Sequence, residues 1–577
     1  MRGHRSSCLR FSIEEKEMKT TFSYDHYYKY EEIKSNLEFF AKQYPDLVTL
    51  EVNCVTEEGR NQYVVTLTNK KTGEALSKPG WYLDGNIHAG EVTSSMCAMH
   101  TLDYLVTNYG SDPDATKLLD EETIYVIPRV TPDGAETYLT TPKTLRSANR
   151  EYMPREGGVR SEDLDGDGVV RMMRIRTPYG AWKIDPENEG SMKLREPDDT
   201  DGTFYDIYPE GVLVSYDGDE NLKMEQDPWG LDFNRNFPLG WFPDSRQPGA
   251  GKYPLSNTET KAIVDFALSH PNIGGAAIGH TSGGLLLYPP GTKPSKSAPY
   301  EDIKSMKAIA AMGQEELGYL PMNIFDSFMT DQVNFDSGAL DDWFYQSQGV
   351  PAYTVEFWDL DTRAGVPYNW FDHSKETPKT RMERFNACMK WVKENAPQYY
   401  QDWETFEHPA FGTVEIGGFN YKFTHQNPPE DLLCAECEKD TRFNIRFAKA
   451  MPKLTIDTLN AEVVGDDLYR ITAVVGNLGY LPTNLTDEAV SLNVSKPVKV
   501  TFEGAEILSG KAEQEIGNLS GYSRTVTGAF FYGNLSTEQN APARKKVTWL
   551  VRAKEGTSVK VCACQEKAGT ASATVVL

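Results

Sequence analysis

The segment WYLDGNIHAGEVTSS places His88 and Glu91 three residues apart, directly after a strand-like run and at the start of a predicted helix. An imidazole and a carboxylate on one turn can reach the same ion, and these ligand types suit zinc. The H-x-x-E spacing alone is not specific, because exposed turns also contain it. A metal site therefore requires a further ligand from a distant part of the chain.

The segment AAIGHTSGG supplies that ligand as His280, at the carboxyl end of a short apolar run. Taken alone, His280 would be interpreted as a hydrogen-bonded core histidine. Together with His88 and Glu91 it completes two imidazoles and one carboxylate, which leave a fourth position for water. That arrangement is typical of a catalytic zinc site rather than a structural one.

Hydrolysis also requires a base, and the strand-like run AYTVEFWD contains Glu356 among apolar residues. Burying a carboxylate costs several kcal/mol unless a metal or hydrogen-bond donors compensate, so such a residue is either paired or functional. In LDFNRNFP, Arg235 lies beside Asn234 and offers a bidentate fork for a substrate carboxylate. Asp232 could accept a hydrogen bond from a ligand histidine.

These motifs, in this order, resemble the M14 family of zinc carboxypeptidases over roughly residues 25–400. The resemblance also includes the segments VIPRVTPDGAE, GKYPLSNTET and SGALDDWFYQSQGVPAYTVEFWD. It implies an α/β/α fold with a mixed, mostly parallel sheet, one zinc ion, and removal of C-terminal residues from peptides. Because strands follow this region, the chain resembles a bacterial-type member with a C-terminal β-sandwich.

The resemblance also implies a role for each matching residue. The zinc ligands would be His88, Glu91 and His280, and Glu356 would act as general base and acid. The other roles are substrate binding and orientation: Asn234 and Arg235 would bind the terminal carboxylate, and Asp232 would orient His88.

Three further positions follow from the same resemblance. Arg146 is the better match to the family's oxyanion-stabilising arginine, with Arg150 as the alternative. Asp341 falls where members that prefer basic C-terminal residues carry Asp, although a solvated loop aspartate is an equal interpretation. The tyrosine that usually closes over the substrate is absent, since Asn334 and Phe335 occupy its position.

The stretch between Glu91 and His280 is enlarged, and within it Asp163, Asp165 and Asp167 match the opening half of a calcium loop, D-x-D-x-D-G. The twelfth position of such a loop is Arg174 here instead of Glu. Calcium binding at these aspartates is thus a hypothesis, with a polar turn as the alternative.

The elements that must position these residues alternate between strand-like and helical runs up to about residue 400. Such alternation predicts an α/β fold with a mostly parallel sheet covered on both faces. From residue 454 onward, short strands separated by Gly, Asn and Pro turns predict an antiparallel β-sandwich. The expected division is a tail, a catalytic domain, a connector with a long helix, and the sandwich: residues 1–20, 21–403, 404–453 and 454–577.

Composition excludes several classes of function. The chain of 577 residues has 59 Lys and Arg against 84 Asp and Glu, a formal net charge of −25. Such an acidic excess argues against nucleic-acid binding and against adhesion to anionic membranes. No apolar run approaches the ~20 residues that span a bilayer. The first residues lack the pattern of a signal peptide, so a cytoplasmic location is expected.

The sequence therefore predicts a zinc metallopeptidase that removes C-terminal residues from peptides. Two alternatives remain open at this point. One is a zinc amidase or peptidase acting on cell-wall or γ-glutamyl peptides, whose products also carry a carboxylate. The other is a binding protein built on an inactive peptidase scaffold, which would not need to keep the buried Glu356. The partner of the sandwich is not predicted.

Overall fold

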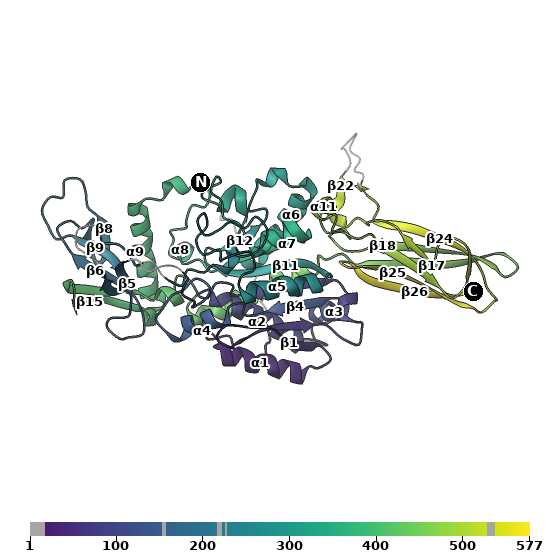
Figure 1. Ribbon diagram of the computed structural model, residues 1–577, viewed down its shortest axis with the longest axis horizontal. Coiled ribbons are helices and arrows are strands. Elements are labelled where there is room, and N and C mark those ends of the chain that lie inside the picture. Colours follow the sequence, from purple (N-terminus) through teal and green to yellow (C-terminus); the bar gives the residue numbers. More distant parts are fainter. Residues whose placement is uncertain (1–17, 153–156, 216–221, 226–227, 528–536, 540) are drawn as a thin grey trace, which may run out of the picture.

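A computed structural model describes residues 18–152, 157–215, 222–225, 228–527, 537–539 and 541–577. Figure 1 shows a central body of helices and strands, a smaller group of strands at one end, and the C-terminal strands at the other end. Most of the predicted N-terminal tail lies outside the described residues.

The central body is built on one mixed sheet of eight strands. In spatial order these are β1 (Val48–Val55), β2 (Asn61–Leu67), β4 (Thr123–Ile127), β3 (Gly80–Gly85), β11 (Ile273–Thr281), β14 (Ala352–Phe357), β12 (Leu285–Tyr288) and β13 (Leu320–Asn323). The four central strands β4, β3, β11 and β14 are all parallel, and β12 is parallel to β13. The remaining pairs are antiparallel. The predicted mixed, mostly parallel sheet is confirmed.

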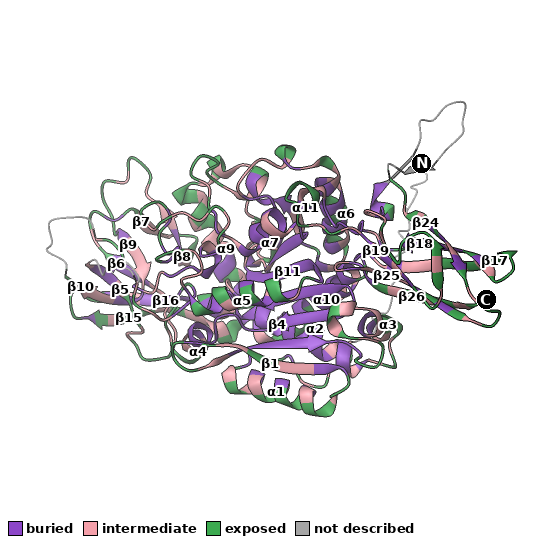
Figure 2. Ribbon diagram, turned by 45° about the vertical axis from the view of Figure 1, so that its right-hand side comes forward, coloured by how far each residue is buried: buried purple, intermediate pink, exposed green. Residues whose placement is uncertain are grey.

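Helices cover both faces of this sheet. One face carries α1 (Tyr30–Gln43), α2 (Val92–Thr107), α3 (Pro113–Glu121), α6 (Tyr300–Leu317) and α10 (Glu430–Ala448), and the other carries α5 (Thr258–Ser269) and α7 (Leu340–Gln348). Alternating side chains of β3 make the two contacts: Trp81 meets Phe447 of α10 at 5.8 Å between ring centroids, and Tyr82 meets Phe344 of α7 at 5.2 Å. The central strands are therefore buried throughout, as Figure 2 shows.

A second, antiparallel sheet joins two distant parts of the chain. Its order is β15 (Tyr400–His408), β16 (Gly412–Phe419), β6 (Met172–Arg176), β9 (Tyr205–Pro209), β7 (Trp182–Asp185) and β8 (Asn188–Leu194). The guanidinium of Arg174 on β6 donates to both carboxylate oxygens of Glu415 on β16, at 2.8 and 2.9 Å. The enlarged stretch after Glu91 is thus paired with β15 and β16, which lie far along the chain. The helix α9 (Pro378–Asn395) packs against this second sheet.

Four smaller elements complete this part of the molecule. The strands β5 (Gly158–Ser161) and β10 (Gly211–Val214) form a separate antiparallel pair. The short helix α4 (Pro132–Thr140) follows β4, and α8 (Leu360–Arg363) packs against α9. Sequence patterns did not indicate any of the strands β5 to β10.

Residues 404–453 were expected to connect the two domains. The long helix expected there is α10, and it packs against α2 and α6 of the central body. The residues before it contribute to β15 and β16 of the second sheet. Residues 404–453 therefore contribute strands to the second sheet and a helix to the layer that covers the central sheet.

The C-terminal strands form two facing antiparallel sheets, which confirms the predicted sandwich. One sheet contains β17 (Leu454–Gly465), β18 (Leu468–Asn477), β24 (Arg544–Arg552) and β20 (Glu506–Ser509); the other contains β21 (Glu513–Glu515), β19 (Lys499–Glu503), β25 (Ser558–Gln565) and β26 (Gly569–Val576). The core between them includes Trp549 and Phe502, whose rings are stacked 5.2 Å apart. Inward-facing residues alternate with exposed ones along β24 and β25, as one buried face per sheet requires.

The sandwich contacts the central body at the amino ends of the parallel strands. Lys567 donates to the carbonyl oxygen of Ile273, the first residue of β11, at 2.7 Å. The hydroxyl of Thr486 donates to the carbonyl oxygen of Gly349 at 2.7 Å. Since β11 rises about 3.3 Å per residue, the sandwich contact lies roughly 23 Å along the strand from His280. Within the described residues, no helix has the length and apolar character needed to cross a membrane.

Candidate active site

The loop between β3 and α2 carries His88 and Glu91, and local hydrogen bonds fix its shape. A Cβ at Gly85 would lie 2.5 Å from the carbonyl oxygen of Ser94, so only glycine lets α2 approach this closely. The Asn86 amide donates to the carbonyl oxygens of His88 and Ala89, at 2.6 and 3.1 Å. The Ser94 hydroxyl donates to the carbonyl oxygen of Glu91 at 2.6 Å. The loop is therefore held from both ends.

Three neighbouring parallel strands bring the candidate residues to one edge of the sheet. His88 and Glu91 follow β3, His280 lies at the carboxyl end of β11, and Glu356 lies at that of β14. His280 and Glu356 are direct partners in the β11–β14 register. In open α/β sheets, ligands bind where the carboxyl ends of the strands meet. The sequence placed these residues at strand ends correctly.

His88, Glu91 and His280 form a buried candidate metal site. The Nδ1 atoms of the two histidines lie 3.2 Å apart. Each of these nitrogens lies 2.9 Å from a different oxygen of Glu91. The three side chains thus present their ligand atoms to one common point.

The hydrogen bonds around His88 show that these residues fit a cation. His88 Nε2 lies 3.1 Å from Oδ1 of Asp232, an acceptor, so Nε2 donates and Nδ1 is the nitrogen that can bind a metal. Nδ1 of His88 then faces an oxygen of Glu91 and Nδ1 of His280. Such a set is satisfied by a shared cation, and two imidazoles with one carboxylate suit Zn²⁺.

Asp232 also anchors Arg146. Nε of Arg146 donates to Oδ2 of Asp232 at 2.8 Å, and Nη1 lies 3.6 Å from Glu91. Burial raises the pKa of Asp232, but the charges of Arg146 and His88 outweigh it and hold that pKa well below the usual range. The Arg146 side chain is 42% exposed, so it remains accessible to a ligand at the edge of the site.

Glu356 lies beside these groups with a perturbed acidity. Burial raises its pKa to about 7, with opposition from His280 and Arg146 and support from Glu91 and Asp341. A carboxyl group with a pKa near neutrality can accept a proton and return it at neutral pH. This is the property that a combined general base and acid needs.

Asn234 and Arg235 lie in the short helical turn that follows Asp232. The carbonyl oxygen of the Asn234 side chain accepts from the backbone N–H of Leu340 at 2.9 Å, and its amide nitrogen lies 3.5 Å from Nε2 of His280. Nη2 of Arg235 donates to Oδ2 of Asp336 at 3.0 Å. Sequence patterns gave no sign of Asp336, which occupies one prong of the guanidinium fork.

Asp341 is buried at the start of α7 and is not a solvated loop residue. Its Oδ2 accepts from the Thr354 hydroxyl at 2.8 Å. Thr354 precedes Glu356 by two residues on β14, and residues two apart share one face of a strand. The sequence did not indicate Thr354, although that spacing could have done so.

The two residues at the position of the family's closing tyrosine lie in the loop before α7. Asn334 donates to Asp331 at 2.9 Å, and the Phe335 ring packs against Phe242 and Phe325 at 5.8 and 6.0 Å. Asn334 is exposed and Phe335 is half-buried in an aromatic cluster. Neither contributes a phenolic hydroxyl, as the sequence indicates.

Arg150, the alternative to Arg146, is turned away from the site. It forms ion pairs with Glu259 at the start of α5 and with Glu57. Its Nη1 also donates to Asn257 at 3.3 Å. Of the two arginines, only Arg146 contacts Asp232 and approaches Glu91.

The three aspartates of the predicted calcium loop do not converge, so that prediction needs correction. One carboxylate oxygen each of Asp163, Asp165 and buried Glu210 lie within 4.8 Å of one another. Asp167 is not part of this cluster and instead forms an ion pair with Arg171. Both oxygens of Asp163 accept backbone N–H groups of the loop, from Gly166 and Gly168. The turn is stabilised by these hydrogen bonds, and calcium binding is not supported.

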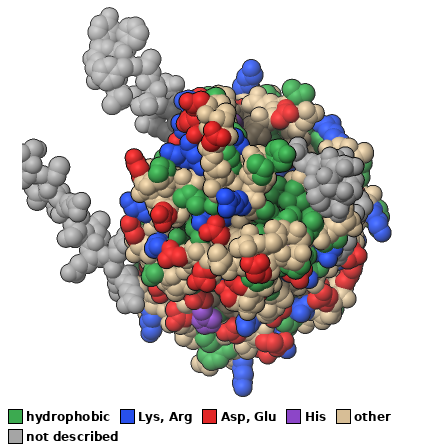
Figure 3. All heavy atoms as spheres, turned by 90° about the vertical axis from the view of Figure 1, so that its left-hand side faces the viewer, with side chains coloured by type: hydrophobic (Ala, Val, Ile, Leu, Met, Phe, Trp, Pro, Cys, Tyr) green, Lys and Arg blue, Asp and Glu red, His purple; other side chains and the backbone are tan. Residues whose placement is uncertain are grey.

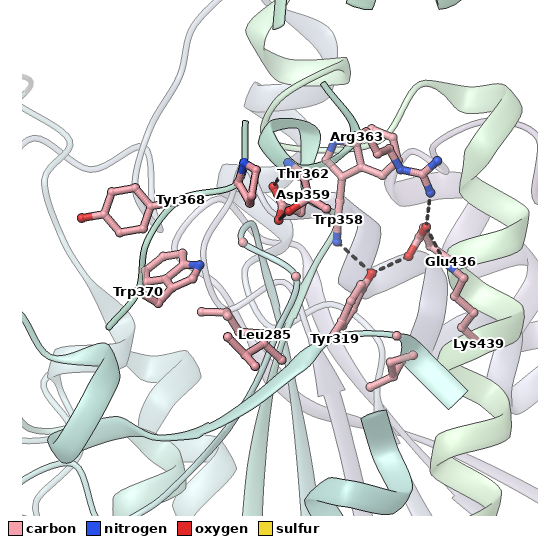
Figure 4. Close-up of a pocket in the computed structure, with 16 residues that line it drawn as sticks. Leu285, Tyr319, Trp358, Asp359, Thr362, Arg363, Tyr368, Trp370, Glu436 and Lys439 are labelled. Atoms are coloured by element: carbon pink, nitrogen blue, oxygen red, sulfur yellow. Dashed lines mark hydrogen bonds and ion pairs between the residues drawn. The ribbon is translucent and has the colours of Figure 1, made fainter. Parts of the chain in front are cut away.

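A cavity of about 390 Å³ lies beyond the end of β14, where Trp358 follows Phe357. Figure 4 shows Tyr368 and Trp370 on one side of it and Glu436 of α10 on the other. The Glu436 carboxylate accepts from Tyr319 and from Arg363, and Tyr319 accepts from the Trp358 backbone N–H at 2.9 Å. These contacts tie the segment after Glu356 to α10.

Comparison with known proteins identifies the family. A family model described as "Zinc carboxypeptidase" matches residues 33–387, more than half of the chain. Residues 453–576 match a second model, described as a domain of unknown function.

Individual relatives are distant. Mouse carboxypeptidase A4 and mouse carboxypeptidase A1 are each 25% identical, over 338 and 354 residues respectively, and each alignment covers 59% of this chain. The chain spans only 64% and 65% of those two proteins. The crystal structure of thrombin-activatable fibrinolysis inhibitor aligns with a TM-score of 0.38 and 18% identity, over 65% of this chain and 76% of that chain. By the match over residues 33–387, this chain belongs to the zinc carboxypeptidase family.

Proposed function

We propose that the protein is a zinc-dependent carboxypeptidase that removes C-terminal residues from peptides. The observation that carries this proposal is the convergence of His88, Glu91 and His280 beside Glu356, at the carboxyl ends of three adjacent parallel strands. Membership of the zinc carboxypeptidase family supports it. Zinc held by these three residues would polarise the scissile carbonyl and lower the pKa of water.

Side chains of the protein transfer the proton, stabilise the oxyanion and orient these groups. Glu356 takes the proton from the attacking water and delivers it to the leaving amine, for which a pKa near 7 is suitable. Arg146 donates to the oxyanion that forms at the scissile carbonyl. Asp232 holds both His88 and Arg146, so one carboxylate fixes the ligand and the oxyanion donor relative to each other.

The terminal carboxylate of the substrate is bound by Arg235 and Asn234, which follow Asp232 in the sequence. Arg235 offers a bidentate fork, and Asn234 lies between it and His280. Asp341, hydrogen-bonded to Thr354, lies beneath the C-terminal side chain of the substrate. A buried carboxylate there favours a basic or hydrogen-bonding C-terminal residue.

Replacing His280 by Ala is expected to remove most of the zinc. The wild-type chain should carry about one equivalent of zinc by elemental analysis, because a site of two imidazoles and one carboxylate loses a third of its ligands in this variant. His26→Ala is the matched control, since His26 is half exposed and pairs with Asp25 and Glu32, neither of which is a candidate ligand. Full zinc content in His280→Ala would contradict the ligand assignment.

Replacing Asp336 by Asn is expected to strengthen binding of free-acid peptides. Asp336 is 54% exposed and pairs with Arg235, so a substrate carboxylate has to compete with it. Exposed ion pairs are worth at most about 1 kcal/mol, so KM should fall by about two- to fivefold with little change in kcat. Asp331→Asn, in the same loop but bonded to Asn334, should leave KM unchanged. An increase in KM for Asp336→Asn would show that Asp336 positions Arg235 instead of competing with substrate.

A further inference from the structure

A cavity of about 620 Å³ begins at Arg146 and extends away from Arg235 and Asp341. Its walls come from α4 and the loop after it, from the strands of the enlarged stretch, and from the segment around β16. Pockets of this size hold small ligands or a few residues of a peptide. The cavity exists only because the second sheet packs against the central body.

The cavity is continuous with the candidate active site. Arg146 belongs to both, and its guanidinium bonds to Asp232, the partner of His88. A Cβ placed on Gly90, next to Glu91, would lie 2.8 Å from both Tyr138 and Gln426, which line the cavity. The cavity wall is therefore packed directly against the loop that carries two of the three candidate ligands.

The direction of the cavity matches one end of a bound peptide. In the proposed function, Arg235 binds the terminal carboxylate and Arg146 faces the scissile carbonyl. The part of the peptide that precedes the scissile bond must therefore continue past Arg146. The cavity lies there, and neither Arg235 nor Asp341 lines it.

The apolar part of the lining comes from two distant parts of the chain. The half-buried side chains Val170 and Met172 belong to the enlarged stretch. Opposite lie Phe385 of α9 and Phe419 of β16, whose rings are 5.2 Å apart. These groups would bury apolar side chains of a bound peptide.

All acidic and basic side chains that line the cavity are basic: Arg146, Arg171 and Lys422. This lining differs from the chain as a whole, which has a net charge of −25, and from the outer face in Figure 3, where acidic and basic side chains are interspersed. Arg171 is 9% exposed, and its Nε is buried without a hydrogen-bond partner among the described residues. The ammonium of Lys422 bonds the carbonyl oxygens of Tyr138 and Thr141, both at 2.7 Å, and these are neutral acceptors. Arg146 is paired with Asp232 and Arg171 with Asp167, but no carboxylate of the described residues lines the cavity, so a cationic occupant is less favoured there than an anionic one.

We propose that this cavity binds the residues that precede the scissile bond and selects peptides in which they are apolar and acidic. The proposal rests on the proposed carboxypeptidase function, since it needs Arg146 at the scissile carbonyl. It assigns to the enlarged stretch a role in substrate selection.

The test uses the zinc-loaded full chain and synthetic free-acid peptides that share one C-terminal residue. Three peptides carry Leu, Glu or Lys at the two positions before the scissile bond, and an N-acylated dipeptide is too short to fill the cavity. We expect kcat/KM to be at least tenfold higher for the Leu peptide than for the dipeptide, and about fivefold to tenfold higher for the Glu peptide than for the Lys peptide.

Two variants of one residue test the location. Val170→Glu should lower the ratio of kcat/KM for the Glu and Lys peptides, and Val170→Lys should raise it. Because each result is a ratio within one variant, a general loss of stability would not imitate it. Tyr179→Ala is the control, since Tyr179 is 91% exposed on the same stretch and does not line the cavity.

Two outcomes separate this proposal from the function on which it rests. Cleavage of all peptides with equal kcat/KM, or equal ratios in both Val170 variants, would overturn the cavity proposal and leave the carboxypeptidase function intact. Failure to cleave any free-acid peptide would overturn the proposed function, and the cavity proposal with it.

Discussion

Glu356→Gln is expected to abolish hydrolysis while the fold and the zinc content are retained. The amide is nearly isosteric with the carboxyl group but cannot accept the proton of water at neutral pH. General-base catalysis typically contributes about 10²- to 10⁴-fold, so kcat should fall by at least that range. The measurement is kcat on a free-acid peptide, with zinc determined on the same preparation.

The stability of this variant gives an independent check. Because burial raises the pKa of Glu356 to about 7, its ionised form costs the metal-free fold free energy at neutral pH, and a neutral amide removes that cost. The melting temperature of metal-free Glu356→Gln should therefore equal or exceed that of the metal-free parent. Glu383→Gln, an exposed change on α9, should alter neither activity nor stability. Activity within a few fold of the parent in Glu356→Gln would show that another residue is the base.

Amidation of the C-terminus of a peptide is expected to remove most of its turnover. The Arg235 side chain is only 19% exposed, so the charge-assisted pair that it would form with a terminal carboxylate, in place of Asp336, lies in a sheltered site. Truncating one partner of such a pair costs ~2–5 kcal/mol, which corresponds to ~30-fold to several thousandfold in kcat/KM. The comparison is made between free-acid and amidated forms of one peptide.

Variants at Arg235 separate charge from geometry in that effect. Arg235→Met removes both, whereas Arg235→Lys keeps the charge but loses the bidentate fork, so Lys should recover only part of the loss. For both variants the preference for the free acid over the amide should shrink. Equal cleavage of the two peptide forms by the parent would contradict a carboxypeptidase and favour an amidase or endopeptidase.

The sequence predicted the central sheet, and the strand ends at which the candidate metal ligands lie, because their signals are local. Apolar runs as short as those around Tyr82 and Tyr353 favour buried strands over helices, and His280 and Glu356 are polar residues at the ends of such runs. Adjacent parallel strands then bring their carboxyl ends together without further information. The long helix expected between residues 404 and 453 is likewise present, as α10.

What the sequence did not predict depends on contacts between distant residues. The strands β5 to β10 are short and half-buried, and β6 pairs with β16, whose Glu415 is far along the chain from Arg174. Asp336 opposite Arg235, and Thr354 beneath Asp341, are likewise tertiary pairs. The calcium motif was misleading because Asp167 has a local partner, Arg171, four residues away.

The most direct test of the central claim is mass spectrometry of the products from one unmodified peptide. The zinc-loaded protein should release single residues from the carboxyl end and leave a ladder of peptides with an intact amino end. The same reaction with Glu356→Gln should give no ladder. Internal fragments from the parent protein, or an intact peptide after long incubation with a zinc-loaded sample, would contradict the assignment of this site as a carboxypeptidase.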